Sequence, residues 1–188
     1  EGEVVKNIKW TKNLASLKLK AKINNHQAGQ FTRIGFKVND DFITRSYSYA
    51  SAPKDELLEI IYVNIPNGKL SPILHNLKIG DKVSVMQQAI GYFTLDEIPD
   101  GENLWMLATG TALGVFLAIL KTSPPWKRFK KIILIHSVRY SEELIYQDLI
   151  AEMKQLFPDQ FIYLNSVTRS NVKGSFNFRI PEGLSSKK

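Results

Sequence analysis

The sequence of 188 residues contains no cysteine, which excludes disulfide bonds, thiolate metal sites, iron–sulfur ligation and a cysteine nucleophile within it. It also contains no long apolar run. Stretches such as residues 104–107 and 132–135 are far shorter than the roughly 18–20 residues that cross a bilayer. Histidine is scarce, and His26, His75 and His136 lack the spacing of metal ligands. We therefore expect neither a metal site nor a membrane span.

Acidic residues are in the minority. The 25 lysines and arginines exceed the 18 aspartates and glutamates, which gives a net charge of +7. Residues 1–100 hold 13 basic and 11 acidic side chains, whereas residues 101–188 hold 12 and 7, so the second half carries most of the positive charge. Such a field suits phosphate groups, nucleic acid or an acidic protein, and it does not choose among them. The chain does not open with the basic and apolar regions of a secretory signal, so we expect a cytoplasmic location.

The first hundred residues predict closely spaced strands. Apolar and basic residues alternate over residues 17–23, a pattern typical of a strand with one face buried and the other in water. Further strands are predicted at residues 34–38, 44–50, 57–65 and 82–87, separated by turns rich in Asn, Asp, Gly and Pro. This spacing favours a small antiparallel barrel over residues 1–99.

After Pro99-Asp100-Gly101, strands alternate with helices. The predicted order is a strand at residues 104–108, a Gly/Thr turn, a helix at 113–120, a strand at 131–137, a helix at 142–157 and a strand at 161–167. This alternation predicts a parallel α/β sheet over residues 100–188. Three strands are fewer than the five or six of a doubly wound domain, so we expect the C-terminal part of this domain to be missing.

Residues 44–50 place cationic and aromatic side chains on one face of a barrel strand, because Arg45, Tyr47 and Tyr49 alternate with small residues. The small residues are Ser46, Ser48 and Ala50. An arginine fork pairs with phosphate, a tyrosine ring stacks on a flat heterocycle, and a serine hydroxyl donates or accepts a hydrogen bond. An ordinary barrel strand with exposed aromatics is the alternative, and this pattern alone does not exclude it.

The segment Asn67-Gly68-Lys69-Leu70-Ser71-Pro72 predicts the start of a helix, with Ser71 as the N-cap and Pro72 as the first helical residue. The free N–H groups and the dipole of a helix start, next to Lys69, suit an anion. A simple turn followed by a capped helix explains the same residues.

A third motif, Gly110-Thr111-Ala112-Leu113-Gly114, follows the first buried strand and opens a helix. In α/β sheets this place holds a phosphate or pyrophosphate. The spacing differs from the dinucleotide fingerprint, and small residues there also serve close packing of helix against sheet.

Arginines follow the next strands: Arg139 after the second, Arg169 after the third, and Arg179 ten residues later. Ligands of such sheets bind beyond the carboxyl ends of the strands. Because no acidic residue is suitably placed to bind a free ribose 2′-hydroxyl, these arginines favour a 2′-phosphate, and hence NADP over NAD. An arginine taken alone is more often a solvated surface charge.

Together, Arg-x-Tyr-Ser, Gly-Lys-Leu-Ser-Pro and Leu-Trp-Met-Leu-Ala-Thr-Gly-Thr-Ala-x-Gly, in this order, resemble the bacterial-type ferredoxin/flavodoxin–NADP reductases over essentially the whole chain. The resemblance implies a barrel that binds FAD and an α/β domain that binds NADP(H). It also implies hydride transfer between nicotinamide and flavin N5, and single-electron exchange with an acidic carrier, ferredoxin or flavodoxin. We expect no nucleic-acid partner and a monomer.

The resemblance implies roles for individual residues. Arg45 contacts the FAD pyrophosphate, Tyr47 packs on the isoalloxazine and Ser48 lies near flavin N5, which makes Tyr47 and Ser48 the expected catalytic residues. The other FAD-binding residues are Ser46, Lys69, Leu70, Ser71 and Thr111. The NADP-binding residues are Gly110, Thr111, Arg139, Arg169 and Arg179, the last two being best placed for the 2′-phosphate.

The chain departs from the family at its end, where it lacks the Cys-Gly-x-Pro-type segment near the nicotinamide and the aromatic C-terminal residue. Two alternatives stay open at this stage. One is an NAD(P)H-dependent flavin reductase module of an oxygenase system. The other, of a different class, is a non-catalytic basic barrel that binds nucleic acid.

Overall fold

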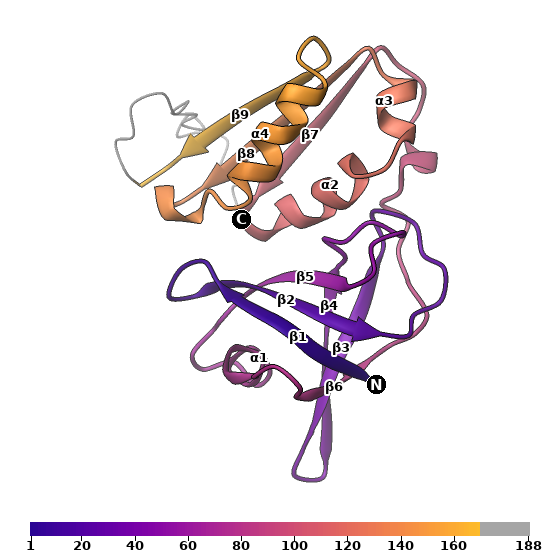
Figure 1. The fold of residues 1–188 in the computed structure, drawn as a ribbon. Helices are drawn as coiled ribbons and strands as arrows, with labels where there is room; N and C mark the ends of the chain where they lie inside the picture. The colour runs from indigo at the N-terminus through magenta and orange to yellow at the C-terminus, as the bar shows by residue number, and fades with distance from the viewer. Residues whose placement is uncertain (170–188) are drawn as a thin grey trace, which may run out of the picture.

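The structure, a computed structural model, describes residues 1–169. Its first part is a six-stranded antiparallel sheet in the order β4-β3-β6-β1-β2-β5 (Figure 1). The strands are β1 (Gly2–Lys9), β2 (Leu14–Ala21), β3 (Phe31–Val38), β4 (Asp41–Ser48), β5 (Leu58–Val63) and β6 (Lys82–Val85). Just beyond β4, Tyr49 pairs with Ile60 of β5, which joins the two outer strands and closes the sheet on itself. The predicted antiparallel barrel is confirmed.

The first half of β2, from Leu14 to Leu17, is buried on both faces. Leu17 and Leu19 lie in the barrel core, while Leu14 and Ser16 are buried on the outer face. The predicted alternation holds from residue 17 onward, where Leu17 and Leu19 are buried, Lys18 is partly buried and Lys20 is exposed, whereas the outer face is covered at Leu14 and Ser16. The outer face is buried because the second part of the molecule packs on it.

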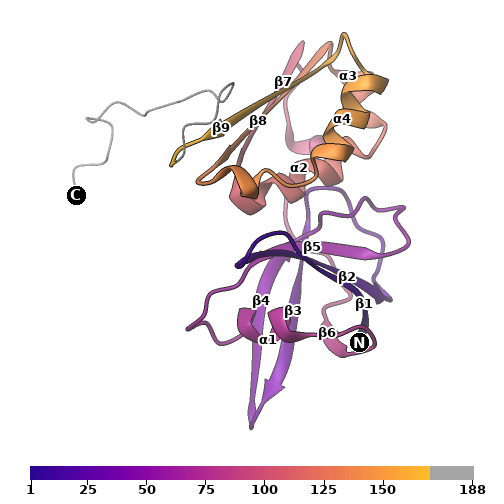
Figure 2. The same cartoon turned by 60° about the vertical axis from the view of Figure 1, so that its left-hand side comes forward.

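The second part is a three-stranded parallel sheet in the order β7-β8-β9, formed by β7 (Asn103–Thr109), β8 (Lys131–Val138) and β9 (Phe161–Val167). Three helices lie on one side of this sheet, the side toward the barrel (Figures 1 and 2). They are α2 (Leu113–Leu120), α3 (Pro124–Arg128) and α4 (Gln147–Leu156). Short 3-10 turns stand at η1 (Leu95–Glu97), η2 (Gly110–Ala112) and η3 (Ser141–Glu143). The predicted parallel α/β sheet is confirmed.

The helix predicted at residues 142–157 is shorter in the structure. Residues 141–143 form η3, and Tyr146 then takes a left-handed backbone conformation with a φ of 59°. Such a residue cannot continue a right-handed helix. The helix α4 therefore begins only at Gln147.

Helix α2 lies between the two sheets (Figure 1), and all eight of its residues are buried. A helix that is apolar all round belongs in a core. Its Gly114 faces the barrel, because a Cβ placed there would lie 3.1 Å from Ile61 and 3.2 Å from Ala50. Ala50 and Ile61 accordingly belong to the same apolar cluster as α2. The division of the chain at residue 99 stays a prediction.

Within residues 1–169, no helix is long and apolar enough to cross a membrane.

Candidate functional site

The end of β4 presents polar side chains to solvent. Arg45, Ser46 and Ser48 are exposed, and Tyr47 is half-buried against the barrel core. Burial raises the pKa of the Tyr47 phenol, and the nearby Arg45 partly offsets this rise. Tyr49 is fully buried, so the expectation that it shares a ligand-facing surface with Arg45 and Tyr47 is wrong. Tyr49 pairs with Ile60 of β5 and belongs to the barrel core, against which Tyr47 also packs.

Strand β5 connects this segment with the loop that carries Lys69. The Tyr49–Ile60 bridge brings the end of β4 against β5, and the two strands are neighbours in the structure. Burial, followed by the proximity of Tyr47, raises the pKa of Tyr62 to about 12, although a hydrogen bond to Asn7 opposes the rise. Tyr47 and Tyr62 therefore lie close together, and the loop that carries Lys69 continues from the strand beside Tyr47.

The helix α1 (Ser71–Asn76) follows this loop. Its N-cap is Leu70 and Ser71 is its first residue, so the predicted N-cap is one position off. The hydroxyl of Ser71 instead accepts a hydrogen bond from the backbone N–H of Ile65, 2.9 Å away, and so closes the loop. Lys69 is exposed, whereas Leu70 and Ser71 are buried. Of these three residues, only Lys69 presents its side chain freely to an anion.

The Gly110–Thr111 turn reaches the barrel from the other sheet. Gly110 has a φ of 52° and a Cβ placed on it would meet nothing within 4 Å, so the turn needs glycine for its conformation and faces open space. The turn η2 contacts β5, the strand beside Tyr47. The turn η2, which includes Thr111, and the strand β4 therefore both contact β5.

His136 on β8 forms a hydrogen bond with this turn. It is fully buried on β8, and its Nε2 lies 3.2 Å from the carbonyl oxygen of Gly110. Because that carbonyl only accepts, the Nε2–H donates. Burial lowers the pKa of His136, so the ring is neutral near pH 7. On its other side, Nδ1 lies 3.5 Å from the hydroxyl of Tyr163, which accepts a hydrogen bond from Gln147 (3.1 Å). Sequence analysis missed this role; the available signal was a histidine within an apolar strand.

Arg139 and Arg169 lie side by side, since the backbone N–H of Arg169 donates to the carbonyl of Arg139 at 2.9 Å. Both side chains are exposed. The carboxylate of Glu143 accepts the backbone N–H of Arg139 (2.9 Å) and that of Tyr140 (3.1 Å), which fixes the chain after β8. Arg179 lies outside the described residues. Gly110, Arg139 and Arg169 each follow a parallel strand, so they share one edge of the sheet.

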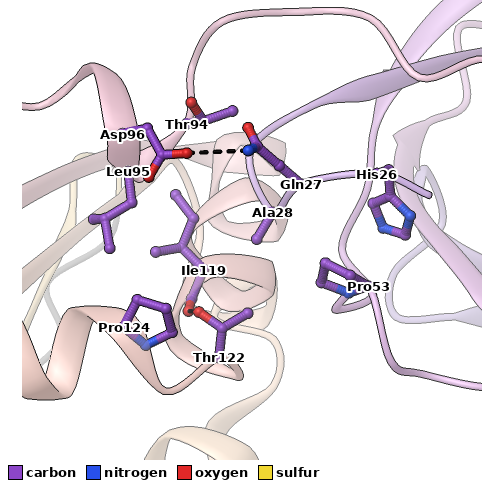
Figure 3. Close-up of a pocket in the computed structure, with 10 residues that line it drawn as sticks. All are labelled: His26, Gln27, Ala28, Pro53, Thr94, Leu95, Asp96, Ile119, Thr122 and Pro124. Atoms are coloured by element: carbon purple, nitrogen blue, oxygen red, sulfur yellow. Dashed lines mark hydrogen bonds between the residues drawn. The ribbon is translucent and has the colours of Figure 1, made fainter.

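A separate cavity of about 220 Å³ lies at the opposite end of α2 (Figure 3). There Gln27 donates a hydrogen bond to Asp96 across 3.0 Å. The cavity is lined by His26, Gln27, Ala28, Pro53, Thr94, Leu95, Asp96, Ile119, Thr122 and Pro124. None of the predicted site residues is among them, so the cavity and the predicted site are distinct.

The fold and these residue groups define an oxidoreductase with a flavin-binding barrel and a dinucleotide-binding α/β part. Residues 1–93 match the oxidoreductase FAD-binding domain family, and residues 106–180 match the oxidoreductase NAD-binding domain family. A flavodoxin/ferredoxin–NADP reductase of Shigella flexneri is 42% identical over 96% of this chain and 73% of its own length. The chain belongs to the flavodoxin/ferredoxin–NADP reductase family.

Other known proteins of the same kind are also similar to this chain. A ferredoxin–NADP reductase of Pseudomonas aeruginosa is 35% identical over 76% of this chain and 58% of its own length. The crystal structure of a ferredoxin NADP+ reductase from Neisseria gonorrhoeae, with bound FAD and NADP, matches 96% of this chain and 73% of that chain, with a TM-score of 0.88 and 32% identity. A reductase from Plasmodium falciparum with 2′P-AMP has a TM-score of 0.76 at 20% identity, which shows the fold alone.

Proposed function

We propose that this flavoprotein passes electrons between NADP(H) and ferredoxin or flavodoxin through FAD, and that β4, α1 and η2 form its flavin site. The contact of the turn η2 with β5 carries the proposal, because β5 is also in contact with β4, the strand that holds Tyr47 and Ser48. The family relatives favour this function over an oxygenase reductase module and over a nucleic-acid-binding barrel.

The flavin site would use residues from both parts of the molecule. The exposed Arg45 suits the FAD pyrophosphate, and the exposed Lys69, in the loop between β5 and α1, would add a second cation. Ser46 and Ser48 present free hydroxyls, and the Tyr47 ring offers a flat surface on the barrel wall. Leu70 and Ser71 shape the phosphate loop through burial and the Ser71–Ile65 hydrogen bond. Thr111 would close the site from the α/β side.

The NADP(H) site would lie along the carboxyl edge of β7, β8 and β9. Gly110 and Thr111 allow close approach of the dinucleotide, and the paired Arg139 and Arg169 supply positive charge for its 2′-phosphate. Arg179, beyond the described residues, is expected to add to this charge.

Bound FAD would supply the hydride chemistry and the one-electron steps. The residues of the chain would provide position and electrostatics. Tyr47 would hold the plane of the ring, Ser48 would hydrogen-bond its reacting edge, and His136 would hold the Gly110 carbonyl so that the turn keeps one conformation. Holding two reactants in the correct relative geometry contributes a large part of the rate enhancement in a bimolecular transfer.

The test is an absorbance spectrum of the purified protein, followed by anaerobic titration with NADPH. We expect flavin absorbance that bleaches on titration. Arg45→Ala is expected to lower FAD affinity by about 10- to 100-fold, the size of a lost charged hydrogen bond. Lys12→Ala removes an exposed cation in the β1–β2 turn and serves as the control. A colourless protein that does not bind added FAD would refute the proposal.

A further inference from the structure

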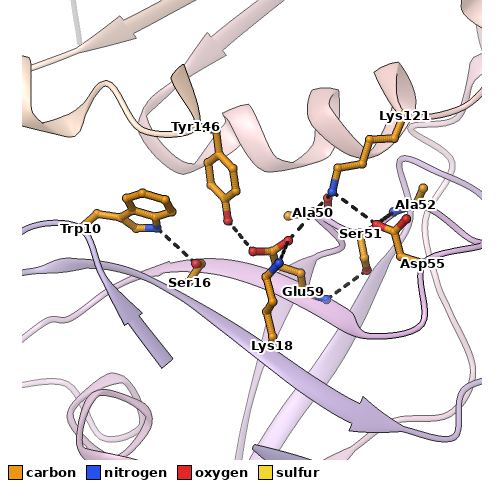
Figure 4. Close-up of polar contacts among 10 residues, drawn as sticks. All are labelled: Trp10, Ser16, Lys18, Ala50, Ser51, Ala52, Asp55, Glu59, Lys121 and Tyr146. Atoms are coloured by element: carbon orange, nitrogen blue, oxygen red, sulfur yellow. Dashed lines mark hydrogen bonds and ion pairs between the residues drawn. The ribbon is translucent and has the colours of Figure 1, made fainter. Parts of the chain in front are cut away.

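Glu59 on β5 is a carboxylate buried where the barrel meets the α/β part, with 3% of its surface exposed (Figure 4). The Tyr146 hydroxyl donates to its Oε1 across 2.6 Å. The ammonium groups of Lys18 and Lys121 lie 3.6 Å and 4.0 Å from its Oε2. A buried charge needs such partners, because an unpaired one is very costly. We call Glu59, Tyr146, Lys18 and Lys121 the junction cluster.

Tyr146 is held in the cluster at a conformational cost. Its φ of 59° lies in the left-handed region that non-glycine residues seldom adopt. Its hydroxyl is buried, and burial together with the Glu59 charge raises its pKa, so it stays a donor. Its ring lies 5.0 Å from that of Trp10, whose indole N–H donates to the Ser16 hydroxyl of β2 at 3.2 Å. The conformation of Tyr146 is therefore fixed by contacts across the junction.

Lys121 attaches the end of α2 to the same carboxylate. It also donates to the carbonyl of Ala50 (3.1 Å) and pairs with Asp55 (3.3 Å), both in the barrel (Figure 4). The start of α4 and the end of α2 thus converge on Glu59. Apolar contacts are non-directional, whereas these polar contacts fix one orientation of the two parts.

The geometry points to Glu59 as a positioning residue for hydride transfer: the junction cluster sets the orientation in which the Gly110–Thr111 turn faces Tyr47 and Ser48. Two links carry this orientation to the site. Ile61, two residues along β5, contacts Gly114 at the start of α2, and Lys121 holds the end of that helix. Glu59 would act through β5 and α2 without touching a cofactor. This inference rests on the proposed function.

The experiment compares Glu59→Leu, Glu59→Gln and Tyr146→Phe with matched controls. Glu56→Gln and Tyr92→Phe alter an exposed carboxylate and an exposed tyrosine outside the cluster. In rapid mixing with NADPH, we expect Glu59→Leu to slow flavin reduction by about 10- to 100-fold, the scale of a misplacement near 1 Å. Glu59→Gln, which still accepts from Tyr146, should be slowed less. The KM for NADPH and the FAD content should stay within about twofold of the unmodified protein, because neither ligand touches the cluster.

A second readout does not depend on turnover. Amide hydrogen exchange should become faster at residues 110–114 in Glu59→Leu and Tyr146→Phe, but not in the controls. The double variant Glu59→Gln/Tyr146→Phe should slow reduction by less than the product of the two single effects, because the residues act as a unit.

Unchanged reduction rates and unchanged exchange at residues 110–114 in Glu59→Leu would overturn the inference. So would a lower melting temperature with an unchanged reduction rate, since that result describes a purely structural ion cluster. If NADPH failed to reduce the unmodified protein, the proposed function would fail, and the exchange measurement would still decide whether Glu59 positions the turn.

Discussion

At the scale of single residues, we propose that the paired arginines beyond β8 and β9 give a preference for NADPH. Arg139 and Arg169 are exposed and linked through their backbones, so their guanidinium groups start from neighbouring positions. A 2′-phosphate between them would gain charge-assisted hydrogen bonds that NADH cannot make.

We therefore expect Arg169→Ala to raise the KM for NADPH by about 10- to 100-fold, as the loss of one hydrogen bond to a charged group implies. The KM for NADH should hardly change. Steady-state kinetics with both nucleotides measure the difference, and Lys154→Ala, an exposed cation on α4, is the control. Equal losses with NADPH and NADH would contradict the assignment of the 2′-phosphate.

His136 makes a second prediction at this scale. Its folded-state pKa is lowered by burial, so the unfolded chain binds the proton more readily. Its contribution to stability is therefore complete above the unfolded pKa of about 6.5, and is lost as pH falls through the lower folded pKa. We expect the free energy of unfolding to fall on acidification below that value.

In His136→Gln, this fall should be smaller, because the side chain no longer titrates and can still donate to Gly110. Denaturant unfolding at several pH values measures the effect. Comparing the variant with the unmodified protein cancels the titration of His26 and His75, whose pKa values are also lowered. Parallel curves for the two proteins would show that protonation of His136 does not affect stability.

At the scale of elements, Gly114 permits the close approach of α2 to β5. Gly114→Val would bring branched methyl groups against Ile61 and Ala50, which already lie 3.1 Å and 3.2 Å from the position of a Cβ. We expect a loss of about 1–3 kcal/mol in the free energy of unfolding, as for other overpacked cores.

Thermal or denaturant unfolding tests this expectation. Gly101→Val is the matched control, because a Cβ at Gly101 meets nothing within 4 Å and its φ needs no glycine. If the Gly114 variant were as stable as the control, the helix could shift away from the barrel without cost.

The elements also show how far sequence patterns reach. Local periodicity indicated the barrel strands, the buried run of α2 and the three parallel strands, because each pattern reflects burial along one element. It did not predict that Lys18 turns toward Glu59, or that α4 starts only at Gln147. Both features involve residues far apart in the sequence: Lys18 pairs with Glu59, and Tyr146, the residue before α4, donates to Glu59 from 87 positions away. The role of His136 was also not predicted, because its partner Gly110 is 26 positions away, directly after the neighbouring strand β7.

For the candidate site, the sequence motifs indicated which residues belong to it, and the structure shows which residues and elements they contact. Arg45, Tyr47 and Ser48 were predicted as one ligand-binding segment, and they lie on β4, next to the strand β5 that η2 contacts. The N-cap at Ser71 was wrong because its hydroxyl bonds to the loop rather than to the helix. A sequence pattern cannot distinguish these two acceptor roles.

At the scale of the whole molecule, the net charge of +7 affects the encounter with an electron carrier. Acidic carriers would be steered toward this protein at low ionic strength, and salt would screen the attraction over about 10 Å at 0.1 M. We expect the second-order rate of electron transfer to ferredoxin or flavodoxin to fall steadily as salt is raised. Stopped-flow measurement across ionic strength tests this, with reduction by NADPH measured in parallel. A salt-independent rate would contradict electrostatic steering.

The burial of α2 between the two sheets has a consequence for folding. Leu14, Ala50 and Ile61 of the barrel share an apolar cluster with α2 and the parallel sheet, while the barrel interior forms a second cluster of its own. Separating them would expose this shared surface to water, at a cost proportional to its apolar area. This shared surface should therefore couple the two parts, and we expect them to lose their structure in one cooperative transition.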